Sequence, residues 1–104
     1  MSLDVESRLA LARDEPAVVE FLNEHGGSVE ADSDDAVRWV TLHPVREPGQ
    51  NYVARIVWSS YPHKEPSVLF ADGVRGALGV ASAWPNIRGY RAPNDICMPF
   101  TAEG

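Results

Sequence analysis

The sequence predicts an α+β domain in which an N-terminal helix packs on an antiparallel β-meander. The first 25 residues are rich in Leu, Ala and Glu, a composition typical of a helix. Residues 36–72 instead contain three short strand-like stretches, and in the first two of them apolar and polar side chains alternate, the pattern of half-buried strands. The connections between these stretches are short enough to join antiparallel neighbours.

The helix is expected between residues 2 and 25, with Ser2 or Asp4 as its N-cap. Pro16 is costly inside a helix but suits a first turn, so Asp14 is expected to cap a fresh start. The segment is therefore either one kinked helix or two short helices. The two glycines at 26–27 are expected to end it.

The polar stretch "SVEADSDD" at residues 28–35 is expected to be a solvated loop. Strands are then predicted within 36–45, 51–60 and 67–72. The second of them alternates most clearly, with Tyr52, Ala54, Ile56 and Trp58 on one face and Val53, Arg55 and Val57 on the other.

The remainder of the chain gives weaker signals. Residues 73–84 contain three glycines and no clear period, so they predict either a loop or a poor helix. From Trp84 onward, prolines at 85, 93 and 99 predict extended, irregular backbone.

Length and composition predict one soluble domain over residues 1–104, of which 1–3 and 103–104 look vector-derived. No apolar run approaches the roughly 20 residues of a bilayer span, and no secretory signal is evident, so we expect a cytoplasmic protein. The net charge of −6 disfavours nucleic acid as a partner. His25, His43 and His63 lie on separate predicted elements, which disfavours a metal site.

Three short motifs follow one another in an informative order. They are "YPHKEPSVLF" at 61–70, "WPNI" at 84–87 and "ICM" at 96–98. Together with the leading helix and the meander, this order resembles the ubiquitin-conjugating enzymes, from about residue 37 to residue 98. The resemblance implies a divergent, bacterial member of the ubiquitin-conjugating-enzyme-like (UBC-like/RWD) superfamily. The matching residues are Tyr61, Pro62, Lys64, Pro66, Pro85, Asn86, Ile87, Ile96 and Cys97.

The resemblance implies that Cys97 carries a ubiquitin-like protein as a thioester and passes it to an amine. A thiolate suits this role because it attacks well and also leaves well. Asn86 would donate a hydrogen bond to the oxyanion that forms during amine attack. The implied partners are a ubiquitin-like protein and its activating enzyme, and no cofactor or metal is implied.

The sequence also departs from that family. Trp84 occupies the position of a histidine, and the segment between Asn86 and Cys97 is about three residues longer than usual. The chain stops soon after Cys97, so most of the family's C-terminal helices are expected to be missing. These departures favour an alternative, a catalytically inactive RWD-like module that binds another protein, since RWD domains share the fold and the "YPxxxP" spacing. Under that alternative, Cys97 is a small buried thiol.

Overall fold

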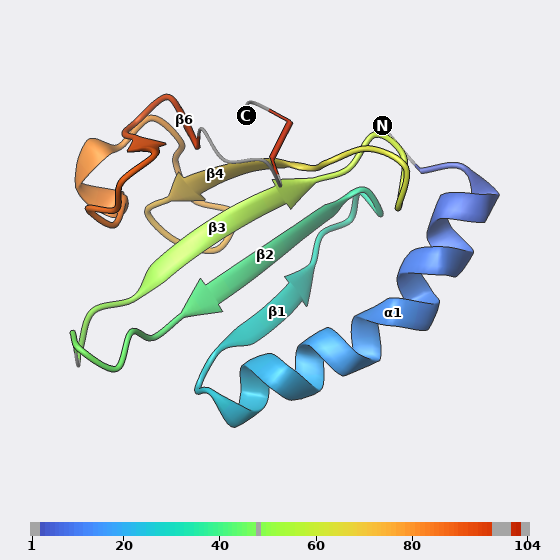
Figure 1. Ribbon diagram of the computed structural model, residues 1–104, viewed down its shortest axis with the longest axis horizontal. Helices are drawn as coiled ribbons and strands as arrows, with labels where there is room; N and C mark the ends of the chain where they lie inside the picture. The colour runs from blue at the N-terminus through green and yellow to red at the C-terminus, as the bar shows by residue number, and fades with distance from the viewer. Residues whose placement is uncertain (1–2, 48, 97–100, 103–104) are drawn as a thin grey trace.

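The computed structural model describes residues 3–47, 49–96 and 101–102. Helix α1 (Val5–Glu24) is followed by strands β1 (Ser28–Ala31), β2 (Val37–Leu42), β3 (Tyr52–Val57) and β4 (Ser67–Ala71). A 3₁₀ turn, η1 (Ala81–Ala83), then leads to the two-residue strands β5 (Tyr90–Arg91) and β6 (Asp95–Ile96). Figure 1 shows α1 alongside β1, and β6 at the far end of the sheet.

The four longer strands form one antiparallel sheet in the order β1-β2-β3-β4, which confirms the predicted meander. The prediction of a solvated loop at 28–35 was wrong for its first half, because Ser28–Ala31 pairs with β2 along its whole length. Three of the four residues of β1 are exposed, whereas no residue of β2, β3 or β4 is. Backbone pairing with β2, rather than side-chain burial, defines it.

Helix α1 is continuous through Pro16, which settles the choice between one helix and two. The side chain of Asp4 is the N-cap and accepts a hydrogen bond from the backbone N–H of Ser7 at 2.7 Å. The expected cap at Asp14 was wrong, since this residue lies inside the helix. Gly26, with φ at +80°, ends the helix in the conformation that glycine adopts at little cost.

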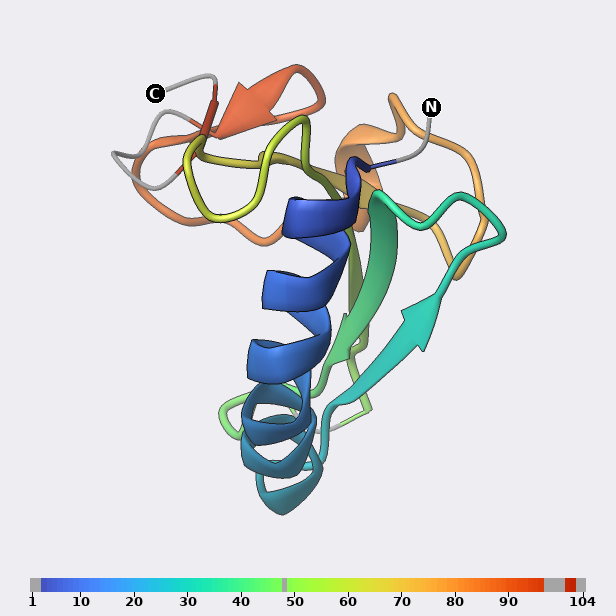
Figure 2. The same ribbon diagram turned by 90° about the vertical axis from the view of Figure 1, so that its right-hand side faces the viewer.

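The two faces of the sheet are covered by different parts of the chain. Figure 2 shows α1 as a separate layer beside the sheet. The face of Ala54 and Phe70 packs against Trp84 and Ile96 from the C-terminal region, and these four residues form a buried cluster. On the opposite face Trp39, Val53 and Ala71 are buried. The segment after β4 passes behind the sheet in Figure 1 and reaches β1, where Arg75 donates a hydrogen bond to the carbonyl of Ala31.

The C-terminal region is more ordered than its prolines predict. The residues after Trp84 form a small hairpin in which Tyr90 pairs with Ile96 and Arg91 pairs with Asp95. The expectation of irregular backbone was therefore wrong for this part. Of residues 73–84, for which a loop or a poor helix was expected, only η1 is helical. Within the described ranges, no helix combines the length and apolarity needed to cross a membrane.

Candidate functional site

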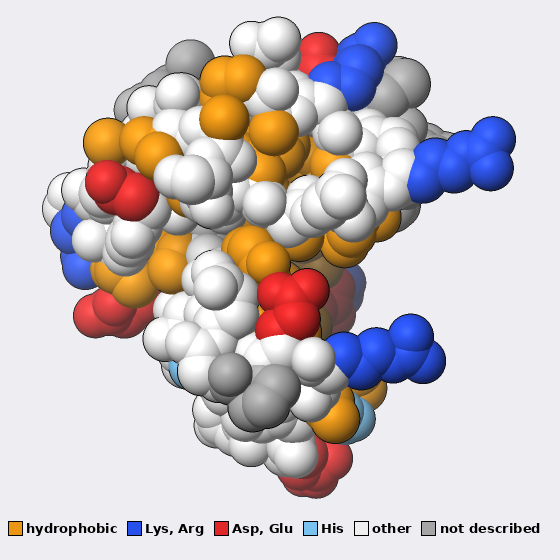
Figure 3. Space-filling view, turned by 90° about the vertical axis from the view of Figure 1, so that its left-hand side faces the viewer, with side chains coloured by type: hydrophobic (Ala, Val, Ile, Leu, Met, Phe, Trp, Pro, Cys, Tyr) orange, Lys and Arg blue, Asp and Glu red, His pale blue; other side chains and the backbone are white. Residues whose placement is uncertain are grey.

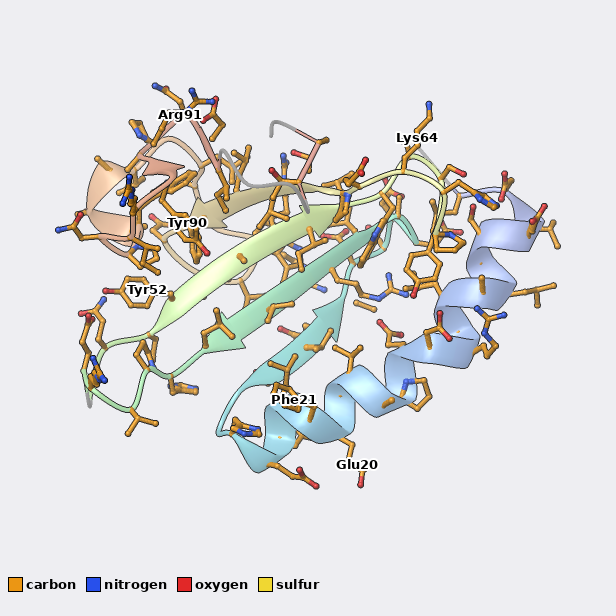
Figure 4. The ribbon with its side chains drawn as sticks, viewed as in Figure 1. Glu20, Phe21, Tyr52, Lys64, Tyr90 and Arg91 are labelled. Carbon is orange, nitrogen blue, oxygen red and sulfur yellow. The ribbon has the colours of Figure 1, made fainter. Side chains whose placement is uncertain are left out.

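The "YPHKEP" motif forms the connection between β3 and β4 and is tied to α1 by two hydrogen bonds. The backbone N–H of Tyr61 donates to Ser7 Oγ at 3.0 Å, and the Tyr61 hydroxyl donates to Asp14 Oδ2 at 2.8 Å. Ser7 is 2% exposed, so the first of these bonds is shielded from water. The Tyr61–Pro62 peptide bond is cis. The motif thus fixes the helix against the end of the sheet, while Lys64 points away from the body of the molecule (Figure 4).

Charge and burial act together on the Tyr61–Asp14 pair. Burial is the main cause that raises the pKa of the Tyr61 hydroxyl, and the neighbouring Asp14 carboxylate adds to it. Conversely, hydrogen bonds from Arg13 and from Tyr61 lower the pKa of Asp14. The pair therefore stays in its hydrogen-bonded form, tyrosine protonated and aspartate ionised, at neutral pH.

Asn86 lies at the apex of a tight turn. The backbone N–H of Ile87 donates to the carbonyl of Pro85 at 3.1 Å, which is the hydrogen bond of a three-residue γ-turn centred on Asn86. A second turn follows directly, closed by the N–H of Tyr90 and the carbonyl of Ile87 at 3.0 Å, with Gly89 at a φ of +93°. Asn86 is exposed, so its side-chain amide is available to donate to a group that approaches from solvent.

Aromatic packing holds this turn on both sides. Trp84, only 6% exposed, lies 5.3 Å from Phe70 between ring centroids, and Tyr90 lies 5.7 Å from the same ring. Figure 4 shows Tyr52 of β3 near Tyr90 at this end of the molecule, and Tyr52 meets Phe70 edge-on. Trp84, which the resemblance aligns with a histidine, thus acts as a core residue, and no described residue accepts a hydrogen bond from its buried Nε1.

The hairpin lies in the segment between Asn86 and Cys97. It runs out through β5, turns at the cis Ala92–Pro93 bond and returns through β6, so Ile96 lies opposite Tyr90. Ile96 is 1% exposed, and its carbonyl accepts a hydrogen bond from Thr101 Oγ1 at 2.6 Å. The chain is therefore anchored in the core immediately before Cys97. Cys97 itself lies outside the described residues.

The charged side chains of the hairpin partly neutralise one another. Arg91 Nε donates to Asp95 Oδ1, so the carboxylate two positions before Cys97 already has a cationic partner. Arg88 is exposed on the turn that follows Asn86. Figure 3 shows that the surface at this end of the molecule is hollowed, with hydrophobic side chains gathered around the hollow.

Metal chemistry has no evident site in the part of the chain that the structure describes. No three His, Cys, Asp or Glu side chains there are grouped so that they could hold a metal ion. His25 instead contacts the end of α1, with Nδ1 2.7 Å from the carbonyl oxygen of Phe21. His63 lies 3.6 Å from Glu6 across the first turn of α1. Both histidines therefore contact groups of α1.

Comparison of the chain with protein-family models, with curated proteins and with solved structures finds no match. What the structure establishes is an N-terminal helix followed by a four-strand antiparallel meander, with a small hairpin that carries the chain to Cys97.

Proposed function

We propose that this protein is a divergent ubiquitin-conjugating-enzyme-like domain that carries a ubiquitin-like protein as a thioester on Cys97. The observation that supports the proposal is the hairpin between Asn86 and Cys97. Its strands bring Ile96 back beside Tyr90, so the longer segment need not separate the two site residues. The "YPHKEP" connection between β3 and β4, tied to α1 through Tyr61, is consistent with the same family.

The proposed reaction has two balanced steps. In the first, the Cys97 thiolate attacks the thioester carbonyl of the activated modifier; the new C–S bond forms and the activating enzyme's thiolate leaves. In the second, an amine attacks the carbonyl; a C–N bond forms, the amine loses its proton to solvent, and the Cys97 thiolate leaves. Asn86 donates its amide N–H to the oxyanion of the second step.

The position of Asn86 suits that role. Packing of Trp84 and Tyr90 against Phe70 fixes the chain on either side of Asn86, which holds its backbone in place while the exposed amide donates to the developing charge. Because Asn86 is exposed, an amine can approach from solvent.

The second candidate is an RWD-like module that binds another protein without catalysis. The observation in its favour is two separate pairs of exposed apolar side chains on α1, Val5 with Leu9 and Val18 with Phe21, which are 52–68% exposed. Each pair is three or four residues apart, so its two side chains are neighbours on the helix surface, and exposed apolar side chains that lie together are typical of protein-binding surfaces. In this case Cys97 forms no thioester.

A transthiolation assay separates the two candidates. The probe is ubiquitin activated as a C-terminal small-thiol thioester, with a ubiquitin-like protein from the same source as a second probe. The enzyme hypothesis predicts an adduct that a reducing thiol removes and that Cys97→Ala abolishes. The Cys97→Ser variant should form at most a thiol-resistant oxygen ester. Absence of adduct with both probes would leave only the binding module.

A further inference from the structure

Arg55 lies in the middle of β3 on the face of the sheet opposite Ala54. Its neighbours in the register are Trp39 on β2 and Leu69 on β4. The side chain is half-buried, and no residue that the structure describes accepts a hydrogen bond from its solvent-shielded Nε. Within the described ranges, Arg55 also has no ion-pair partner.

The guanidinium of the other arginine in the sheet has hydrogen-bond acceptors. Arg38 of β2 donates through Nε to Glu15 and through one terminal nitrogen to the carbonyls of Asp35 and Val37, each at 3.0 Å. For Arg55, water is removed from Nε and no described acceptor replaces it, which costs free energy. An acceptor for the Arg55 Nε–H would therefore have to come from outside the described residues.

Arg55 lines a cavity of about 480 Å³ at the end of the sheet where β3 ends and β4 begins. This volume is within the range of small-ligand sites. The wall combines apolar side chains with a few polar groups; its residues are Asp34, Ala36, Val37, Arg55, Val57, Trp58, Ser59, Glu65, Ser67 and Ala102. Arg55 is the only cationic side chain among them.

We propose that this cavity binds a carboxylate carried on an apolar stem, with Arg55 as the group that recognises the charge. The flat guanidinium presents paired N–H donors that match the two oxygens of a carboxylate. Val37, Val57 and Trp58 supply the apolar surface for the adjoining stem. Both a peptide C-terminus and an Asp or Glu side chain of a partner protein carry this chemistry. The site is separate from the proposed Cys97 chemistry and does not depend on it.

Glu65, a carboxylate in the cavity wall, provides a test of whether the cavity binds a negatively charged group. It is exposed at the cavity and makes no ion pair with Arg55. Its negative charge opposes a carboxylate ligand, so Glu65→Gln should tighten binding about 2- to 3-fold, as expected for one screened like charge. Arg55→Gln should weaken binding of the same ligand about 10-fold or more, because it removes both the charge and the paired donors.

The experiment is an NMR titration of the whole chain with N-acetyl-leucine, followed through backbone amides, the Arg55 side-chain Nε–H and the Trp58 indole N–H. N-acetyl-leucinamide is the matched neutral probe, and N-acetyl-glutamate amide presents a side-chain carboxylate instead of a C-terminal one. Arg46→Gln is the control for loss of one positive charge, since Arg46 is exposed on the β2–β3 turn. The proposal predicts saturable shifts at the cavity residues with N-acetyl-leucine and weak or no shifts with the amide.

The two carboxylate probes distinguish a peptide end from a side chain as the natural source. The proposal is overturned if the acid and the amide shift the same residues equally, or if Arg46→Gln weakens binding as much as Arg55→Gln. It is also overturned if no saturable shift occurs. Should Arg55→Gln fail to fold, the acid-against-amide comparison on the unchanged protein still decides, and Arg55→Lys tests whether a point charge alone restores binding.

Discussion

At the scale of single residues, Asp32 shows how one carboxylate organises the end of β1. Its Oδ2 accepts the indole N–H of the buried Trp39 at 2.7 Å, and its Oδ1 accepts the backbone N–H of Asp34 at 3.3 Å. These hydrogen bonds, the one from Trp39 first, lower the pKa of Asp32 from 3.8 to about 2. The ionised form is therefore favoured in the folded state.

This shift predicts an acid-dependent loss of stability. A depressed pKa stabilises the fold above the unfolded-state value near 3.8, and the contribution disappears as the pH falls toward about 2. Asp32→Asn keeps an oxygen for Trp39 but cannot titrate, so its Tm should fall less than that of the parent between pH 5 and pH 2. Thermal unfolding followed by circular dichroism measures this, with Glu20→Gln as the control for loss of a charge. Parallel curves for Asp32→Asn and the parent would contradict it.

The Tyr61 hydroxyl gives a second test at the residue scale. Tyr61→Phe removes its hydrogen bond to Asp14, which joins the β3–β4 connection to α1, and should lower the free energy of unfolding by about 1 kcal/mol. Tyr52→Phe is the matched control, because its bond to Glu47 at 2.7 Å joins exposed groups and should contribute less than the Tyr61 bond. Urea unfolding of the two variants compares them, and equal losses would argue against a structural role for the Tyr61–Asp14 bond.

Residue-scale predictions from the sequence succeeded where the signal was local. Asp4 as a cap follows from its side chain and the helical pattern just after it. Arg55 could not be singled out, because an arginine in an alternating strand is ordinary. Its lack of an acceptor depends on which side chains the neighbouring strands place beside it, and this is a property of the folded sheet.

At the scale of elements, the close approach of α1 to the sheet depends on Gly27. A Cβ at this position would lie 2.8 Å from the carbonyl oxygen of Thr41 and 3.3 Å from Leu22 Cδ2. Backbone cannot move aside as a flexible side chain can, so the start of β1 would have to shift away from β2.

We therefore expect Gly27→Ala to lower the free energy of unfolding by about 1–3 kcal/mol, the range of an overpacked site. Gly73→Ala serves as the control, since a Cβ there meets nothing within 4 Å, and its effect should stay within about 0.5 kcal/mol. Chemical unfolding of both variants is the measurement. A Gly27 variant as stable as the Gly73 variant would show that β1 is not held this closely.

Element by element, the sequence predicted the helix and the three strands that contain no exposed residue. It missed β1 because most of that strand's side chains face solvent, so only pairing with β2 distinguishes it from a loop. It missed the hairpin because prolines predict irregular backbone, whereas Pro93 lies in the turn between β5 and β6, where it interrupts no pairing.

At the scale of the whole molecule, the proposed site depends on the fold bringing Asn86 and the chain before Cys97 to one end of the sheet. Asn86 was identified by resemblance rather than by local pattern. The sequence could not predict that the residues after Asn86 would form a hairpin. That outcome follows from burial of Trp84, Tyr90 and Ile96 against the sheet.

The role of Asn86 has its own test. Asn86→Ala should slow transfer to an amine by about 100-fold or more, because one oxyanion donor is lost, while thioester formation on Cys97 stays near the parent rate. Single-turnover assays that start from the preformed thioester measure the second step alone. A transfer rate unchanged by the substitution would contradict the assigned role, and Ile87→Ala, which alters the neighbouring exposed side chain, controls for disturbance of the turn.

The most direct test of the central claim is the accessibility of the Cys97 thiol. Because Cys97 is the only cysteine, intact mass after treatment with a bulky alkylating reagent reports on this residue alone. The proposed thioester chemistry predicts rapid modification of the folded protein, at a rate that rises with pH as the thiolate forms and approaches that of a denatured control. Modification only after denaturation would contradict it, because a sulfur packed in the core cannot receive a protein-sized acyl group.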